Sequence, residues 1–225
     1  MADLAPPGVH TAEATGDGGP DGAVELHPDE LACVAGAVAE RRREFTTVRG
    51  CARRALAELG VAPVPLVPGT MGAPEWPAGV VGSMTHCRGY RAAAVARSAA
   101  YASLGVDAEP VEPLAPVVAR RALRAAERAR LAEVFPPAEE PAARRLAVSA
   151  KEAAYKAFSP WLGRGFGFAD FTVELLPTGV FTTRPPAPVP FRSSAGEGVF
   201  TGRWVVGPEI LLTLLALPAV PSASC

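Results

Sequence analysis

Lysine is almost absent from this sequence of 225 residues. Of its 22 basic residues only Lys151 and Lys156 are lysines, and both lie in the stretch SAKEAAYKAF, around Glu152. With 23 acidic residues the formal net charge is −1, so the chain lacks the overall positive charge with which proteins bind nucleic acid or anionic membranes. We therefore expect neither a nucleic-acid partner nor a membrane partner, and any basic surface must be local.

Cysteine and long apolar runs are also scarce. The four cysteines lie far apart, without a C-x-x-C pair, at Cys33, Cys51, Cys87 and Cys225. This spacing argues against a zinc site or a disulfide framework and favours reduced thiols. The longest apolar run, ILLTLLAL at 210–217, is far shorter than the about 20 residues that cross a bilayer. The N-terminal residues do not have the pattern of a signal peptide, so we expect a cytoplasmic protein.

The first half of the chain predicts a leader, helices and strands. Residues 1–22 are rich in Gly, Pro and Asp and predict a mobile leader. Residues 28–60 predict one or two helices that begin at a Pro-Asp pair and end at a glycine. Turns are expected over 61–79, then strands over 92–96 and 101–109 joined at a serine. The helical stripe expected to be buried contains Leu31, Val34, Val38 and Phe45.

The second half predicts two helices followed by two hairpins. A basic helix is expected over 116–133, and a second helix after it should end at Pro160. The hairpins should turn at 177–179 and 207–208. Helices and strands in this order predict an α+β protein of two lobes.

We place the division between the lobes near residues 110–116. The N-terminal lobe is then expected to span residues 23–112 and the C-terminal lobe residues 113–225. The sequence contains no detectable internal repeat.

Two carboxylates lie close together in LGVDAEP. If this run is a strand, Asp107 and Glu109 project to one face, because side chains two residues apart do so. Neighbouring carboxylates repel each other unless a cation lies between them. Such oxygen ligands suit Mg²⁺, which completes its shell with water and substrate phosphate. The alternative is a solvated strand end before a proline.

The lysine-containing stretch offers a proton donor and a proton acceptor. Glu152 and Lys156 are four residues apart on the predicted helix, so they share a face, with Tyr155 beside them. A surface ion pair would also explain this spacing, and a GC-rich genome would explain the scarcity of lysine. However, the chain uses arginine 20 times elsewhere, and an ammonium group can release a proton whereas a guanidinium group cannot.

Two further stretches suit phosphate. GVVGSMTHCRGY predicts a glycine-rich turn in which Ser83, Thr85 and His86 present hydroxyls and an imidazole to phosphate oxygens; a structural histidine is the alternative. RRREFTTVRGCARR contains arginines suited to bidentate contacts with a phosphomonoester, and a solvated helix face is its alternative. These arginines are Arg41, Arg42, Arg43, Arg49, Arg53 and Arg54.

Taken together, these motifs resemble the 4′-phosphopantetheinyl transferases of the surfactin and enterobactin type. The resemblance covers residues 41–158 and is carried by RRREFTTVR, WPAGVVGSMTHCRGYRAAAVA, LGVDAEP and SAKEAAYKAF. It implies a monomer of two similar, pseudo-symmetric α+β lobes that hold coenzyme A in the cleft between them. It also implies transfer of the 4′-phosphopantetheine arm to a serine of apo acyl or peptidyl carrier proteins, in polyketide, nonribosomal peptide or fatty-acid synthesis.

The resemblance also implies roles for individual residues. Asp107 and Glu109 would hold Mg²⁺, or Mn²⁺ in its place, against the pyrophosphate of coenzyme A. Glu152 would be a third metal ligand or a general base, and Lys156 would contact the pyrophosphate and protonate the leaving phosphate. The implied phosphate and adenosine contacts are Lys151, His86, Ser83, Thr85, Arg41 and Arg49. For His86, direct chemistry and orientation both stay open.

One loop departs from the family pattern. Many relatives have a basic residue in the loop that here is LVPGTMGAPEWP, near Pro68 or Met71, and this chain has none. Arg53 or Arg88 would substitute for it, or coenzyme A would bind more weakly.

A basic helix suggests where a carrier protein binds. Carrier proteins of this kind are acidic around the modified serine, so a local basic surface favours their approach. The predicted helix over 116–133 supplies Arg120, Arg121, Arg124, Arg128 and Arg130. A solvated helix face is the alternative.

Two other classes of function stay open. A Mg²⁺-dependent nuclease also gathers Asp, Glu and Lys, but its last pair is usually spaced E-x-K, and the charge here suits a polyanion poorly. A non-catalytic module that binds a carrier or coenzyme A would not need three carboxylates.

Overall fold

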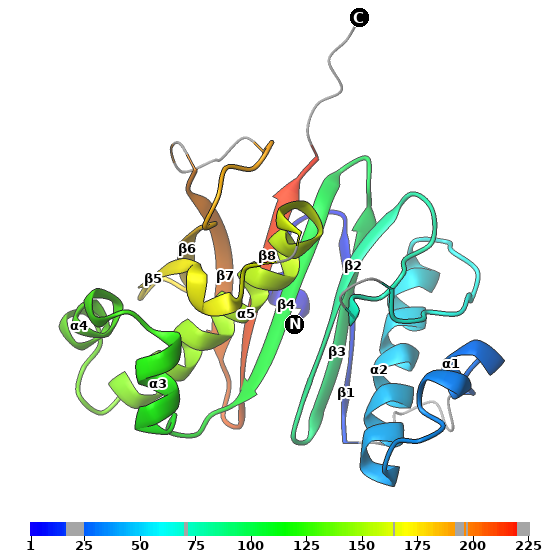
Figure 1. The fold of residues 1–225 in the computed structure, drawn as a ribbon, viewed down its shortest axis with the longest axis horizontal. Helices are drawn as coiled ribbons and strands as arrows, with labels where there is room; N and C mark the ends of the chain where they lie inside the picture. The colour runs from blue at the N-terminus through cyan, green and yellow to red at the C-terminus, as the bar shows by residue number, and fades with distance from the viewer. Residues whose placement is uncertain (17–24, 70–71, 164, 192–195, 197, 220–225) are drawn as a thin grey trace, which may run out of the picture.

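The computed structural model contains two antiparallel β-sheets that lie side by side (Figure 1). The α+β class predicted from the sequence is confirmed. No helix in the described part of the chain is both long and apolar enough to span a membrane. The structure describes residues 1–16, 25–69, 72–163, 165–191, 196 and 198–219.

The three-stranded sheet has the order β1-β3-β2. Its strands are β1 (Val9–Thr15), β2 (Val80–Cys87) and β3 (Tyr90–Arg97). The helices on its side of the molecule are α1 (Pro28–Cys33) and α2 (Ala39–Glu58), and a 3₁₀ turn, η1 (Ala2–Leu4), precedes the first strand. The prediction of one or two helices over 28–60 is thus confirmed, and α2 contacts β1 and β3.

The five-stranded sheet has the order β4-β8-β7-β6-β5. Its strands are β4 (Tyr101–Pro110), β5 (Thr172–Leu176), β6 (Val180–Arg184), β7 (Phe200–Val206) and β8 (Ile210–Pro218). The helices are α3 (Pro116–Ala122), α4 (Ala125–Val134) and α5 (Glu140–Leu162), with a 3₁₀ turn, η3, at Phe168–Asp170. Both predicted hairpins are confirmed as β5–β6 and β7–β8.

Strand β3 is the middle strand of the three-stranded sheet, and most of its central residues are alanine. Its positions 92–96 are all fully buried. Ala93 and Val95 pack with residues of α2, whereas Ala92, Ala94 and Ala96 pack with Leu104 and other residues of the second sheet. Because successive side chains of a strand point to opposite faces, this one strand contributes to the core of both lobes.

Two hydroxyl groups join the sheets. Ser83 Oγ accepts a hydrogen bond from the backbone N–H of Val106 at 3.1 Å, and Thr85 Oγ1 accepts one from Ala108 at 3.1 Å. Both hydroxyl residues are buried in β2. The prediction of a glycine-rich turn around them is therefore wrong, because the stretch is a strand whose polar side chains satisfy the facing strand β4.

Several boundaries also differ from the sequence-based expectations. Residues 1–16 are not a mobile leader, because β1 pairs with β3 along its length; the rest of the predicted leader, 17–22, lies outside the described residues. Strand β4 pairs with β8, so the second sheet begins before the predicted division at residue 112. The basic helix predicted over 116–133 is two helices, α3 and α4. Pro160 lies inside α5 rather than ending it.

The buried stripe predicted for the first helices is half correct. Val34 and Phe45 are buried, whereas Leu31 is 54% and Val38 72% exposed. Among the described cysteines Cys33, Cys51 and Cys87 are free thiols, and Cys225 lies outside the described residues.

Candidate active site

Helix α5 lies directly on strand β4, and a glycine permits the close approach. A Cβ atom added at Gly105 would lie 1.9 Å from the backbone oxygen of Ala153. The two elements therefore meet backbone to backbone at this point. The polar side chains of α5 at Arg145, Ser149 and Lys156 reach the acidic end of β4.

Asp107 is at the centre of this contact and is buried. Its Oδ1 accepts from Lys156 Nζ at 2.7 Å and from Thr85 Oγ1 at 3.3 Å, and its Oδ2 accepts from Ser149 Oγ at 2.8 Å. Lys156 also donates to the carbonyl of Val106 at 2.9 Å. Asp107 of one predicted pair and Lys156 of the other are thus in direct contact, and three donors fix the carboxylate.

Glu109 and Glu152 lie in the electrostatic field of Asp107. Burial and the charge of Asp107 raise the pKa of Glu109, although Arg145 and Lys156 oppose this. Burial and the charge of Asp107 also raise the pKa of Glu152, with a further contribution from Glu109 and an opposing one from Lys156. The three predicted carboxylates are thus within electrostatic reach of one another, and we call Asp107, Glu109 and Glu152 the acidic cluster.

The acidic cluster suits a hard divalent cation in its donor chemistry, because carboxylate oxygens are the ligands that Mg²⁺ takes. No three His, Cys, Asp or Glu side chains of the described residues are arranged to hold a metal ion as they stand. Lys156 and Arg145 instead contact two of the carboxylates, Asp107 and Glu109. A metal ion at Glu109 would therefore compete with Arg145 for that carboxylate.

His86 and Arg41 lie together near the N-terminal end of α2. Arg41 Nη1 is 2.8 Å from His86 Nε2, and Glu44 Oε2 lies 3.4 Å from the same nitrogen. Burial lowers the pKa of His86, and the positive charges of Arg41, Arg91 and Lys156 lower it further against the opposing charge of Glu44. A neutral imidazole beside a guanidinium group can receive a hydrogen bond or turn toward an anion.

Arg49 is buried, unlike Arg41. Its guanidinium carbon lies 3.4 Å from the centre of the Phe45 ring, and its Nε donates to the carbonyl of Leu66 at 3.2 Å. Burial lowers its pKa to about 10. The residue therefore ties α2 to the loop that follows it and is not an open phosphate clamp as it stands.

Lys151 is separated from the acidic cluster. It is fully buried, and its ammonium group donates to the carbonyl of Ala122 at 2.8 Å and to Glu127 Oε2 at 2.7 Å. Glu127 also accepts from the N–H of Val173. The phosphate contact implied for Lys151 disagrees with this position, in which the lysine joins α5 to α3 and α4.

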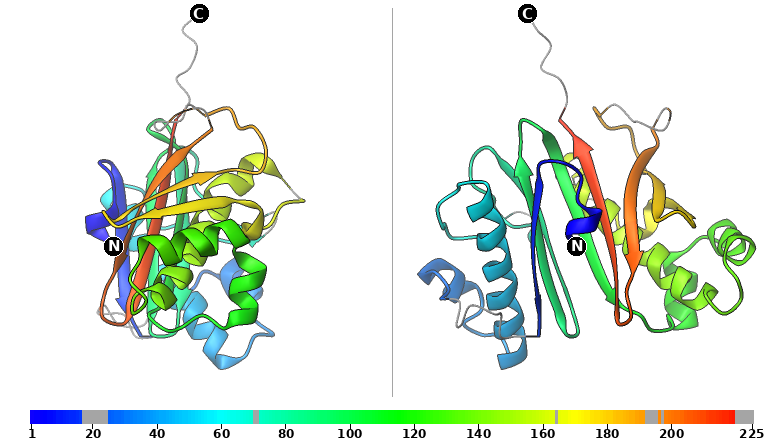
Figure 2. Two further views of the ribbon diagram at one scale, coloured as in Figure 1. Left: turned by 90° about the vertical axis from the view of Figure 1, so that its left-hand side faces the viewer. Right: turned by 180° about the vertical axis from the view of Figure 1, so that it is seen from behind.

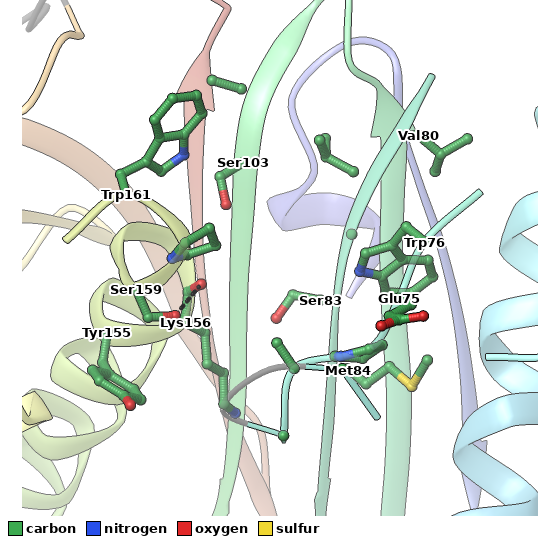
Figure 3. A pocket seen from close by; sticks show the side chains of 18 of the residues that line it. Glu75, Trp76, Val80, Ser83, Met84, Ser103, Tyr155, Lys156, Ser159 and Trp161 are labelled. Carbon is green, nitrogen blue, oxygen red and sulfur yellow. Dashed lines mark hydrogen bonds between the residues drawn. The ribbon is translucent and has the colours of Figure 1, made fainter. Parts of the chain in front are cut away.

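A cavity of about 840 Å³ opens between the two sheets. Figure 3 shows Tyr155, Ser159 and Trp161 of α5 on one side, Trp76 and Met84 on the other, and Ser83 and Ser103 between them. Lys156 lines this cavity and also binds Asp107, so it joins the cavity to the acidic cluster.

Comparisons with known proteins identify the family. Residues 29–96 match the 4′-phosphopantetheinyl transferase N-terminal domain, and residues 103–206 match the 4′-phosphopantetheinyl transferase superfamily. The chain is 44% identical to 4′-phosphopantetheinyl transferase Svp of Streptomyces mobaraensis over 220 residues, which cover 97% of this chain and 89% of that protein. The chain belongs to the 4′-phosphopantetheinyl transferase family.

Two further relatives agree with this assignment. The transferase is 42% identical to 4′-phosphopantetheinyl transferase PptT of Mycobacterium tuberculosis, over 84% of this chain and 85% of that protein. It is 41% identical to 4′-phosphopantetheinyl transferase Npt of Nocardia iowensis, over 86% of this chain and 90% of that protein. The enzyme class expected from the motifs is confirmed.

Both residues suggested as substitutes for the missing basic residue of the transferase have other partners. Arg53 forms an ion pair with the fully buried Glu30, and Arg88 forms one with Glu112. Pro68 forms an isolated bridge with Pro74, and Met71 lies outside the described residues. Among the residues that the structure describes, these contacts place neither arginine in the cavity of the transferase.

Several residues near the candidate site were not predicted from the sequence. Arg145 and Ser149 contact the acidic cluster, and both precede Glu152 at positions that share its helix face; this spacing is a signal that sequence reasoning could have used. Trp76 and Trp161 line the cavity from segments far apart in the chain. No spacing rule in one sequence brings those two tryptophans together.

Proposed function

We propose that this transferase moves the 4′-phosphopantetheine arm of coenzyme A to a serine hydroxyl of an apo acyl or peptidyl carrier protein, releasing 3′,5′-ADP. The observation that supports this most directly is the position of Lys156. Its ammonium group lies between a cavity large enough for an extended arm and the acidic cluster. A diphosphate at this junction would have its arm on the cavity side.

The acidic cluster would hold the metal ion. Asp107, Glu109 and Glu152 are the ligands that we assign to Mg²⁺, with Mn²⁺ as an alternative of the same chemistry. A bound divalent cation would neutralise charge on the pyrophosphate and so lower the barrier to phosphoryl transfer.

The residues of α5 supply the proton transfers. The serine oxygen forms a bond to the β-phosphorus, the one that bears pantetheine, as the bond to the bridging oxygen breaks. Glu152, whose pKa is raised by burial and by Asp107, accepts the serine proton directly or through water. Lys156 donates to the leaving phosphate.

The other end of coenzyme A would lie toward α2. Arg41 is exposed beside His86 and suits the 3′-phosphate, with His86 orienting it or contacting phosphate itself. Arg49 would support the adenosine end indirectly, because its contacts with Phe45 and the carbonyl of Leu66 fix α2 against the following loop. Ser83 and Thr85 contribute by joining β2 to β4 beside the cavity.

The carrier protein would bind at α3. Arg120 and Arg121 are exposed there, next to Val117 and Val118, which are 53% and 40% exposed. Arg124, Arg128 and Arg130 have partners within the protein. The proposed partners are carrier domains of polyketide, nonribosomal peptide or fatty-acid synthases, met by a cytoplasmic monomer.

A mass measurement tests this function. Incubation with coenzyme A, Mg²⁺ and an apo carrier protein should add about 340 Da to the carrier, the mass of one phosphopantetheine arm. Removal of the metal with a chelator should abolish the addition, and Mg²⁺ should restore it. A carrier that binds without gaining mass would instead indicate a non-catalytic module, and cleavage of DNA or RNA would indicate a nuclease.

A further inference from the structure

Arg145 of α5 holds the connection between β4 and α3 by three hydrogen bonds. Its Nη1 donates to Glu109 Oε2 at 2.7 Å, its Nε donates to the carbonyl of Glu112 at 2.6 Å, and its Nη2 donates to the carbonyl of Pro113 at 3.1 Å. The side chain of Arg145 is only 15% exposed. All three guanidinium nitrogens are therefore engaged.

These acceptors belong to two parts of the molecule with different proposed roles. Glu109 is a member of the acidic cluster, whereas Glu112 and Pro113 lead into α3. Arg145 is also seven residues before Glu152, close to two helical turns, so it lies on the same face of α5 as that carboxylate. One side chain thus contacts both the acidic cluster and the connection that leads into α3.

A permanently charged guanidinium group competes with a metal ion for a carboxylate. Arg145 cannot lose its proton under ordinary conditions, so its hold on Glu109 weakens only if the carboxylate moves or binds another cation. Its two backbone contacts have no such competitor. Whether Arg145 keeps its hydrogen bond to Glu109 therefore depends on what else Glu109 binds.

We propose that Arg145 is a positioning residue that couples divalent-cation binding at Glu109 to the placement of residues 112–122. The inference depends on the metal site and carrier surface of the proposed function. Cation binding draws Glu109 away from Arg145 and changes how the guanidinium group holds the start of α3. By reciprocity, a carrier protein that fixes α3 changes the affinity for the cation by the same factor.

Two measurements on the full chain test this coupling without coenzyme A or a carrier. The first is the Kd for Mn²⁺, measured by electron paramagnetic resonance. Arg145→Met removes the competing charge and should lower the Kd about five-fold or more, as expected for a coupling of this kind. Arg144→Met is the matched control, because Arg144 pairs only with Glu140 on the same helix among the contacts described, and its Kd should equal that of the wild type.

The second measurement is amide hydrogen exchange over residues 112–122. Mn²⁺ should change the exchange rates in the wild type and in Arg144→Met, and this response should be lost in Arg145→Met. Arg145→Lys keeps the positive charge but cannot form all three hydrogen bonds of the guanidinium group. Its Kd for Mn²⁺ should therefore stay near that of the wild type, whereas the exchange response should be lost.

An unchanged Kd in Arg145→Met, or an exchange response that survives in it, would overturn the inference. Failure of the wild type to bind Mn²⁺ would overturn the metal site and the inference together. A negative carrier-modification assay alone would refute only the proposed function, because neither measurement uses that reaction.

Discussion

At the scale of single residues, Asp107 and Glu152 carry the same charge but are held differently. Asp107 accepts hydrogen bonds from Thr85, Ser149 and Lys156. For Glu152 the described contacts include no hydrogen bond, and its environment acts through burial and charge. The first carboxylate is therefore part of the packing between α5 and β4, whereas the second is available for chemistry.

This difference predicts that only one of the two carboxylates is needed for stability. Glu152→Gln should lower kcat about 10²- to 10⁴-fold, because the proposed general base is lost, and should leave the free energy of unfolding within about 0.5 kcal/mol of the wild type. Asp107→Ala should lower kcat and also cost about 2–3 kcal/mol, because Lys156 and two hydroxyls lose their acceptor. Urea unfolding together with steady-state kinetics separates the two. Equal stability of the two variants would contradict this account.

The positions of Lys151 and Lys156 were only partly predictable from the scarcity of lysine. That scarcity directed attention to the helix that is α5 in the structure, and Lys156 of that helix lines the cavity. Lys151 was wrongly grouped with it. Residues five apart on an α-helix are separated by about 140° around its axis, so helix geometry alone argues that the two ammonium groups point to different sides.

At the scale of secondary-structure elements, the contact between α5 and β4 depends on Gly105. Gly105→Ala should destabilise the protein by about 3 kcal/mol, because the added methyl group would meet the backbone of Ala153 and neither element can shift without disturbing the acidic cluster. Gly36→Ala is a suitable control, since nothing lies within 4 Å of a Cβ atom at that position. Chemical denaturation measures both. A Gly105→Ala variant as stable as the control would show that the helix can move away from the strand.

Strands with a clear run of apolar residues were predicted from the sequence. Strands β1 and β2, which have polar residues at several positions, were not. The alternation of β4 and the alanines of β3 were visible in the sequence. Strand β2 was not, because Ser83 and Thr85 occupy inward positions that a hydrophobic pattern would fill with apolar residues. Strand β1 has few apolar residues and is defined by its pairing with β3, which a single sequence does not reveal.

At the scale of the whole molecule, the exposed arginines of α3, Arg120 and Arg121, predict where an acidic carrier protein binds. Arg121→Glu should raise the KM for an acidic carrier about ten-fold and leave the KM for coenzyme A unchanged, since α3 lies outside the residues that line the cavity. Arg203→Glu, on β7, makes the same charge change on an exposed residue and should have little effect on either. Steady-state kinetics with each substrate varied in turn provides the comparison. A rise in both constants for Arg121→Glu would exclude α3 as the docking surface.

The order of helices and strands predicted two lobes with a division near residues 110–116, and the boundary between the two sheets lies elsewhere. The proline-rich connection at 110–116 was the clearest break in the sequence, yet the chain passes from one sheet to the other at the short turn between β3 and β4. The sheet to which a strand belongs is decided by the strand with which it pairs. For β4 that strand is β8, which is far away in the sequence.

The near absence of lysine has a practical consequence for anyone who labels or immobilises this protein. Lys151 is inaccessible and the Lys156 side chain is 29% exposed at the cavity, so an amine-reactive dye or an amine-coupled sensor chip has only one lysine side chain to react with. Such attachment would occupy the cavity in which we propose that coenzyme A binds. Coupling through an introduced cysteine or an affinity tag leaves the cavity free.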